Sequence, residues 1–175
     1  MGAGKILSII AAVLALAVIA LSFALPNIFG LYRIEFTALG ITFGAYITGI
    51  GTFMSTGGLP PLGQLAIFEL IGGILVIVGA VVLIVGAVKE MKAAGIVGGI
   101  LVLLGPILLI IDMLIGLSDF ATLIALLGGP AGATPLWGSF TITGPPDILM
   151  AWGIWIGTFI TAGAGVLGII GGATL

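Results

Sequence analysis

Four long apolar runs, which together contain only two charged side chains, constrain the fold of this chain more than any other feature. Each run is about as long as the roughly 20 residues that a helix needs to cross a hydrocarbon core of about 30 Å. The runs cover residues 6–25, 65–88, 93–117 and 148–172. The sequence therefore predicts an all-α integral membrane protein, in which four transmembrane helices form a bundle and a single domain over residues 1–175.

The composition excludes several classes of chemistry. Cysteine and histidine are both absent, so the chain offers no disulfide, no thiolate nucleophile and no histidine ligand for a metal or a haem. Four basic residues are too few for a nucleic-acid-binding surface, and the sequence contains no P-loop or dinucleotide-binding fingerprint. We therefore expect no enzyme activity, no cofactor, no metal site and no nucleic-acid partner.

Three of the basic residues predict the orientation in the membrane. Lys5 precedes the first run, and Lys89 and Lys92 lie between the second and the third. Cytoplasmic loops carry an excess of lysine and arginine. We therefore expect a multi-pass protein of the cell (plasma) membrane with both termini in the cytoplasm, and with the loops 26–64 and 118–147 outside.

Period-2 alternation in the two outer loops predicts a small extracytoplasmic antiparallel sheet of about three strands. In the first loop apolar residues alternate with polar ones: Tyr32, Ile34 and Phe36 against Arg33, Glu35 and Thr37. Residues 136–143 repeat the pattern in the second loop. We also expect a short helix over 118–127 with Ser118 as its N-cap, and Asp147 as the N-cap of the fourth transmembrane helix.

Two segments allow a second interpretation. In the first run the apolar stretch 6–21, followed by Ser22-Phe23-Ala24, resembles a secretory signal peptide, although we expect this run to be the first span. Residues 36–54 are uncharged and nearly long enough for a fifth span, which would move Lys89 and Lys92 to the outside. Four glycines, four threonines and the alternating pattern in this segment favour strands instead, and thus four spans.

The resulting layout resembles that of the claudin-type tetraspan proteins. It has a short inner N-terminus, a longer first outer loop with strands, a tight inner turn and a second outer loop. The resemblance covers the whole chain as topology only. The outer-loop tryptophan motif and the cysteine pair of that family have no counterpart here, so the resemblance assigns no role to any residue of this chain.

Small residues recur at helical spacing in every run. Spanning helices associate through close packing, since lipid tails are as apolar as leucine, and glycine lets two backbones approach. Alanines at 11, 15, 20 and 24 form the stripe of the first run. The predicted helix-packing glycines of the other runs are Gly72, Gly79, Gly86, Gly95, Gly98, Gly99, Gly105, Gly153, Gly157, Gly168 and Gly172. Packing within the bundle and packing against another subunit are both open for these stripes.

Glu69 and Asp112 are the two charges inside the runs. At 1.5 Å per residue, both lie roughly 6–8 Å below the outer boundary on consecutive helices. Intramembrane carboxylates are costly and often functional. Three interpretations are open: one of them pairs with Arg33, both face water at the boundary, or they form a proton or cation site.

The acidic and the aromatic residues of the outer loops each allow two interpretations, one structural and one functional. Glu35, Asp119 and Asp147 are expected to be solvated charges rather than ligands of a divalent cation. The aromatic residues are expected to form an interfacial belt, rather than a platform for a quinone or a lipid headgroup. They are Tyr32, Tyr46, Trp137, Trp152 and Trp155.

The functional prediction rests on the large apolar residues of the two outer loops. The first outer loop contains several large apolar residues, and so does the segment 123–127 of the second. Apolar surface of this kind must be covered, and exposed patches of several hundred Å² mark interaction sites. We expect a non-catalytic structural or accessory subunit that lies in the lipid bilayer and assembles with partner membrane proteins or with itself. The alternative is a small proton or cation channel or transporter that uses Glu69 and Asp112.

Overall fold

The computed structural model describes residues 2–56 and 67–175. Within these residues four helices are long and apolar enough to cross a membrane, which confirms the prediction of a multi-pass membrane protein. They are α1 (Ala3–Ala24), α3 (Ile67–Lys89), α4 (Lys92–Ile115) and α6 (Ile156–Ala173). Two short helices, α2 (Pro26–Phe29) and α5 (Leu117–Leu126), lie beyond them.

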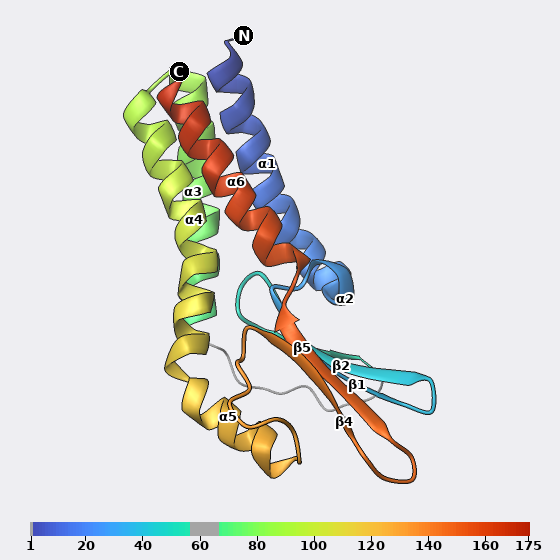
Figure 1. Ribbon diagram of the computed structural model, residues 1–175. Coiled ribbons are helices and arrows are strands. Elements are labelled where there is room, and N and C mark those ends of the chain that lie inside the picture. The colour runs from blue at the N-terminus through green and yellow to red at the C-terminus, as the bar shows by residue number, and fades with distance from the viewer. Residues whose placement is uncertain (1, 57–66) are drawn as a thin grey trace.

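The four long helices form an elongated bundle with a sheet at one end (Figure 1). Each long helix packs mainly on two neighbours, in the cyclic order α1, α3, α4, α6. Both chain termini lie at the end opposite the sheet, beside the turn between α3 and α4. We call these two ends the terminal end and the sheet end. Lys5 and Glu90 form an ion pair of 3.6 Å at the terminal end.

The sheet end contains a five-stranded antiparallel sheet within the described residues, ordered β3-β2-β1-β5-β4. The strands are β1 (Tyr32–Ala38), β2 (Ile41–Ile47), β3 (Phe53–Thr56), β4 (Trp137–Ile142) and β5 (Ile148–Ile154). A small antiparallel sheet built from both loops was predicted, but with about three strands. The fifth-span interpretation of residues 36–54 is wrong, because this segment forms the end of β1, all of β2 and the start of β3.

The predicted fourth transmembrane helix, 148–172, is wrong in its first part. Residues 148–154 form β5, which pairs with β1 on one side and with β4 on the other. Because the sheet satisfies the backbone groups of this segment on both sides, the helix begins only at Ile156. The 18 residues of α6 still span about 27 Å at 1.5 Å per residue. Gly153 therefore lies in a strand, and its predicted role in helix packing is wrong.

Both predicted side-chain caps are also wrong. The Asp147 carboxylate accepts a hydrogen bond of 3.0 Å from the Gly144 N–H, so it stabilises the turn between β4 and β5. The short helix predicted over 118–127 is present as α5, but it begins at Leu117 behind Gly116, without a side-chain cap. Gly116 also ends α4, so the chain turns from one helix into the next without a loop that would need a polar cap.

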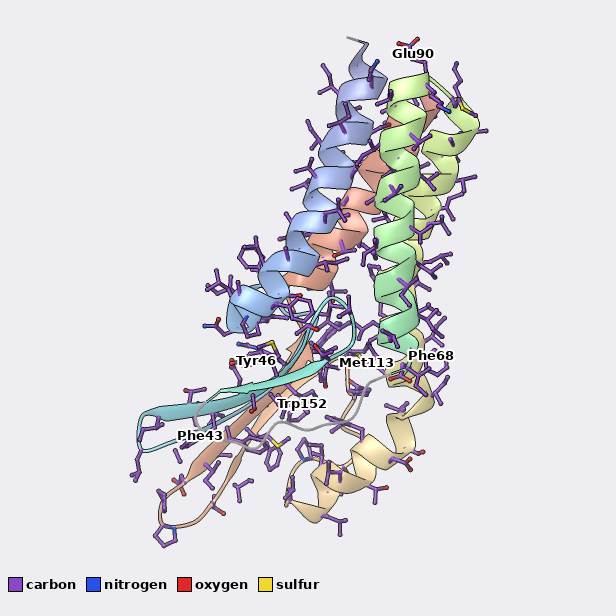
Figure 2. The ribbon with its side chains drawn as sticks, turned by 180° about the vertical axis from the view of Figure 1, so that it is seen from behind. Phe43, Tyr46, Phe68, Glu90, Met113 and Trp152 are labelled. Atoms are coloured by element: carbon purple, nitrogen blue, oxygen red, sulfur yellow. The ribbon has the colours of Figure 1, made fainter. Side chains whose placement is uncertain are left out.

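The two faces of the sheet differ as the alternation predicted. Tyr32, Met150 and Trp152 are buried in an apolar cluster that includes Ile124 of α5 and Leu109 of α4. Figure 2 shows Met113 and Trp152 where the sheet meets the bundle, with Glu90 at the far end. The cluster fastens the sheet to the helices, because α4 and α5 cover its apolar face.

Two hydrogen bonds also join the sheet end to α1 and α6. The Ser22 hydroxyl of α1 accepts a bond of 2.7 Å from the Gly49 N–H, which follows β2. The Thr158 hydroxyl of α6 donates a bond of 2.7 Å to the Leu31 carbonyl, which precedes β1. Each bond satisfies a backbone group where the chain passes between helix and sheet.

Glycines permit the closest helix contacts. A Cβ on Gly79 would lie 2.7 Å from the Gly98 carbonyl oxygen of α4. A Cβ on Gly86 would lie 2.7 Å from the Gly95 nitrogen, and one on Gly72 would lie 3.1 Å from the Gly105 carbonyl oxygen. Real Cβ atoms essentially never show contacts of 2.7 Å, and a contact of 3.1 Å is tighter than most of theirs. Larger residues at Gly79 and Gly86 would therefore force α3 and α4 apart.

The contact between α4 and α6 uses a second set of small residues. A Cβ on Gly95 would lie 2.5 Å from the Gly172 Cα, and one on Gly168 would lie 3.0 Å from the Gly99 Cα. Gly157 approaches the Phe29 and Gly30 carbonyls at the end of α2. It therefore lies at a contact with α2 and not between two of the four long helices. In α1, Ala11 and Ala15 are buried whereas Ala20 and Ala24 are exposed, so only half of the alanine stripe contacts other helices.

Gly79→Ala tests the glycine contact between α3 and α4. We expect it to lower the free energy of unfolding by about 1–3 kcal/mol, because overpacking forces the backbones apart. Gly163→Ala in α6 is the matched control, since its added Cβ would have no atom of another described segment within 4 Å. Unfolding of both variants by denaturant in detergent micelles gives the measurement. Equal stability of the two would show that the α3–α4 separation does not depend on Gly79.

Candidate functional site

The two intramembrane carboxyl groups meet at the sheet end of the bundle. Glu69 lies in the first turn of α3, and Asp112 lies in the last turn of α4, where its carbonyl accepts the Gly116 N–H. Because a tight turn joins these antiparallel helices at the terminal end, the start of one lies beside the end of the other. Both residues line the same cavity.

Glu69 is unusual because its carboxyl group is buried without a complete set of hydrogen-bond partners. The residue is only 2% exposed, and its Oε2 atom has no hydrogen-bond partner among the described residues. An ionised carboxylate only accepts hydrogen bonds. The two carboxyl groups therefore offer oxygen acceptors in an apolar setting.

The structure does not support the interpretation in which Arg33 pairs with one of these carboxylates. The Arg33 guanidinium donates a hydrogen bond of 2.8 Å to Glu35 Oε2 and stacks 3.4 Å from the centre of the Trp155 ring. Successive strand residues point to opposite faces. Arg33 consequently lies on the face opposite Tyr32 and Ile34, which line the cavity beside Glu69.

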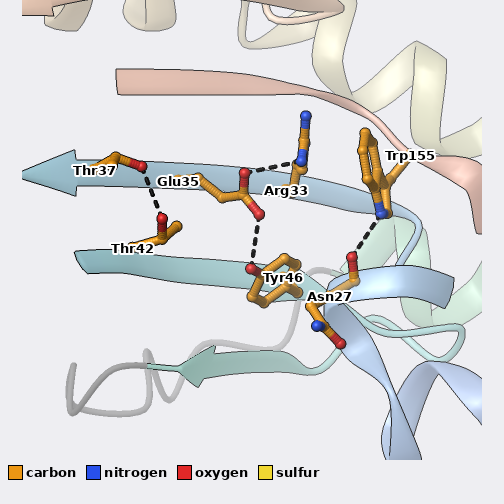
Figure 3. A network of polar contacts seen from close by, with 7 residues as sticks. All are labelled: Asn27, Arg33, Glu35, Thr37, Thr42, Tyr46 and Trp155. Carbon is orange, nitrogen blue, oxygen red and sulfur yellow. Dashed lines mark hydrogen bonds and ion pairs between the residues drawn. The ribbon is translucent and has the colours of Figure 1, made fainter. Parts of the chain in front are cut away.

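A polar network occupies that opposite face (Figure 3). The Tyr46 hydroxyl donates a bond of 2.8 Å to Glu35 Oε1, so Glu35 accepts bonds from two strands. The Trp155 indole N–H donates a bond of 2.9 Å to the Asn27 carbonyl of α2. The alternation of residues 32–37 contained the signal for this network, because it placed Arg33 and Glu35 on one face.

The aromatic residues do not form the predicted interfacial belt. Tyr32, Tyr46 and Trp152 are buried within the sheet and its contacts, and the Trp152 ring meets Phe120 edge to face at 5.4 Å. Trp155 is half-buried, and Trp137 has 69% of its surface exposed. Of the predicted surface charges, Asp119 and Asp147 are exposed on α5 and on the β4–β5 turn, and no group of three acidic residues that could hold a metal ion is found in the described part of the chain.

A cavity of about 250 Å³ lies beside the carboxyl pair, between the sheet and the ends of α3, α4 and α5. Glu69 also borders a pocket of about 10 Å³ inside the bundle, which is about the size of one water molecule. Thr161 lines this pocket, but its hydroxyl donates to the Gly157 carbonyl. Glu69 thus lines both the cavity and the pocket inside the bundle.

No protein-family model matches this chain, and none of the curated proteins compared with it is significantly similar. The candidate site is therefore defined by its own chemistry. It consists of the paired carboxyl groups of Glu69 and Asp112 and the apolar cavity beside them.

Tyr32→Phe tests how the wall of this cavity is fixed. The Tyr32 hydroxyl donates a bond of 2.7 Å to the Pro135 carbonyl, and its loss leaves that carbonyl unpaired, at a cost of about 1–3 kcal/mol. Burial raises the pKa of Tyr32 above its ordinary value of 10.0, so folding favours the neutral form. The neutral Tyr32 side chain therefore contributes fully to the free energy of unfolding below pH 10, and this contribution is lost as the pH rises above 10.

The measurement is the free energy of unfolding of the wild type and of Tyr32→Phe between pH 8 and pH 11. We expect the difference between them to be constant up to about pH 10 and to shrink above it. A difference that grows with pH would contradict the assignment of Tyr32 as a buried neutral donor.

Proposed function

We propose that this chain is a non-catalytic structural or accessory membrane protein that assembles with copies of itself or with partner membrane proteins. The observation that carries the proposal is the edge of the sheet at β4, which pairs with no further strand among the described residues. Natural sheet edges are protected by charges, prolines, bulges or covering segments. Residues 137–142 contain no charge and no proline, and the residues at alternate positions are exposed.

The register identifies the backbone groups at this edge. The Ile154 N–H donates 2.9 Å to the Leu136 carbonyl, so even-numbered residues of β4 bond to β5. In an antiparallel ladder the intervening residues direct their N–H and carbonyl groups outward. These residues are Trp137, Ser139 and Thr141, which are symmetric about Ser139. A second β4 strand can pair with them antiparallel, around a twofold axis at Ser139.

Exposed apolar side chains beyond the ends of the long helices add support. Leu126 at the end of α5 is 81% exposed, and Leu39 between β1 and β2 is 82% exposed. Leu39 has a positive φ of 51°, which is uncommon for a residue other than glycine. Large apolar groups at such positions are costly in water and favour a partner surface.

The proposal includes an orientation, with the terminal end in the cytoplasm and the sheet outside the plasma membrane. The basis is Lys5, Lys89 and Lys92 at the terminal end, together with the excess of basic residues in cytoplasmic loops.

Single cysteines in this cysteine-free chain test the orientation. We expect Leu126→Cys at the sheet end to react with a membrane-impermeant thiol reagent in intact cells. Glu90→Cys, which is exposed at the terminal end, should react only after the cells are permeabilised. Labelling of Glu90→Cys in intact cells would invert the proposed topology.

The alternative, a proton or cation channel, has weaker support. Beyond Glu69 the described helix surfaces that face the interior consist mainly of small and aliphatic residues, such as Val76, Ala80 and Leu83. The buried Thr161 hydroxyl donates to the Gly157 carbonyl of its own helix. The Ser8 hydroxyl is buried near the terminal end, without a hydrogen-bond partner among the described residues. A conducting path needs a continuous series of polar groups or water, and the described interior does not provide one.

Ser139→Lys tests the assembly through β4. In the antiparallel pair it places two ammonium groups opposite each other, which is destabilising. Wild-type protein in mild detergent is expected to have the mass of a dimer or larger assembly by light scattering. Ser139→Lys should raise its dissociation constant at least about tenfold, or roughly 1.4 kcal/mol.

Ser139→Gln is the matched control, because it adds a similar length without charge and should assemble as the wild type does. Assembly of Ser139→Lys at wild-type affinity would exclude this edge as the interface. A wild-type monomer that co-purifies with no other protein would contradict the proposed function itself.

A further inference from the structure

The cavity beside the carboxyl pair has a combination of features that assembly does not require. It has a volume of about 250 Å³ and lies at the sheet end, outside the contacts between the four long helices. Its walls combine Ile34 and Ile47 of the sheet with Met113 and Phe120 of α4 and α5. Glu69 and Asp112 are the two acidic residues that line it. An apolar pocket with a few convergent polar groups is the usual form of a small-molecule site.

The protein supplies no cation to these carboxyl groups within the described residues. Arg33 is held on the other face of the sheet by Glu35 and Trp155. The lysines all lie at the terminal end, at positions 5, 89 and 92. A buried carboxylate is costly unless it is paired and hydrogen-bonded, and Glu69 Oε2 has no partner among the described residues. The electrostatics of the site therefore favour a cationic guest.

The chemistry of the walls distinguishes between kinds of cation. Calcium takes six to eight oxygen ligands, and magnesium requires an octahedral shell, but no group of three acidic residues is found in the described part of the chain. The remaining walls are aliphatic and aromatic. An organic cation matches both the apolar walls and the two carboxyl groups. Its apolar body contacts the walls, while its ammonium group donates up to three hydrogen bonds to carboxyl oxygens. The Phe120 ring adds a surface that attracts such a cation.

We propose that the cavity between the sheet and the ends of α3, α4 and α5 binds a small organic cation, a protonated primary amine with a short apolar chain. Glu69 and Asp112 together accept the hydrogen bonds of its ammonium group. Since the cavity is smaller than the roughly 300–1,000 Å³ of drug-sized sites, the ligand is a short amine rather than a long-chain lipid. The tight turn between α3 and α4 and the pairing of their glycines hold the two carboxyl groups together for this purpose.

The test uses hexylamine and hexan-1-ol as probes, which share an apolar chain and differ in charge. Titration calorimetry is carried out on the full chain in lipid nanodiscs, with empty nanodiscs as the reference for partition into lipid. We expect saturable binding of one hexylamine per chain, and at least tenfold weaker binding of hexan-1-ol. Magnesium chloride at matched ionic strength should compete no better than sodium chloride.

Variants assign the binding to the carboxyl pair. Glu69→Gln should weaken hexylamine binding at least tenfold and leave hexan-1-ol binding unchanged. Asp119→Asn is the matched control, because it removes the same charge from an exposed position on α5 outside the cavity lining, and should bind as the wild type does. Thermal unfolding without ligand shows whether each variant is folded. If Glu69→Gln is unfolded, Asp112→Asn is used in its place with the same expectation.

Three results would overturn the proposal. Equal affinities for hexylamine and hexan-1-ol would show an apolar cavity without charge recognition. Equal weakening by Glu69→Gln and Asp119→Asn would show general surface attraction of cations. Selective competition by magnesium would identify an inorganic cation as the guest. Each result leaves the proposed assembly through β4 unaffected, since the two use different surfaces.

Discussion

The antiparallel pairing of β1 with β5 organises the sheet end of this protein. It joins Tyr32 to Ile154 and Ala38 to Ile148, so residues from the two loops on either side of the α3–α4 pair become neighbours in one sheet. Two further hydrogen bonds extend this junction, because the Trp155 N–H donates to the Leu31 carbonyl and the Gly157 N–H donates to the Gly30 carbonyl. The segment between α2 and β1 and the start of α6 are therefore held together. Without this pairing, the two hairpins would have no common framework on the helices.

Within the bundle, the limiting factor is how closely backbones can approach. The bilayer provides no hydrophobic force between helices, and α4 meets this condition with glycines on two sides. Gly98 and Gly105 face α3, whereas Gly99 faces α6. The α3–α4 contact in turn sets the separation of Glu69 and Asp112. A change in glycine packing is thus coupled by geometry to the carboxyl pair and to the cavity that it lines.

The sheet performs two different tasks with its two sides. Its apolar face is covered by α4 and α5 and forms a wall of the cavity, while the opposite face carries the network of Arg33, Glu35 and Tyr46. The β4 edge is separate from both. This division allows the proposed assembly and the proposed amine site to be tested independently, because Ser139 and Glu69 share no contact surface.

The sequence by itself determined the membrane class, the four long helices and the composition of each sheet face. Those features follow from local physics: the length of apolar runs, the period of alternation and the small number of charges. The sequence also located Glu69 and Asp112 on neighbouring helices, because a turn as short as residues 89–92 requires α3 and α4 to pack antiparallel side by side.

Tertiary structure alone decided which backbone partners the apolar segments found. Residues 148–154 read equally well as the start of a span, and they became β5 because β1 and β4 offered hydrogen bonds on both sides. The same pairing decided the partner of Arg33, because register and strand face directed it to Glu35 and Trp155 instead of an intramembrane carboxylate. A cavity beside Glu69 is likewise a property of how sheet and helices meet, and no local pattern in the sequence encodes it.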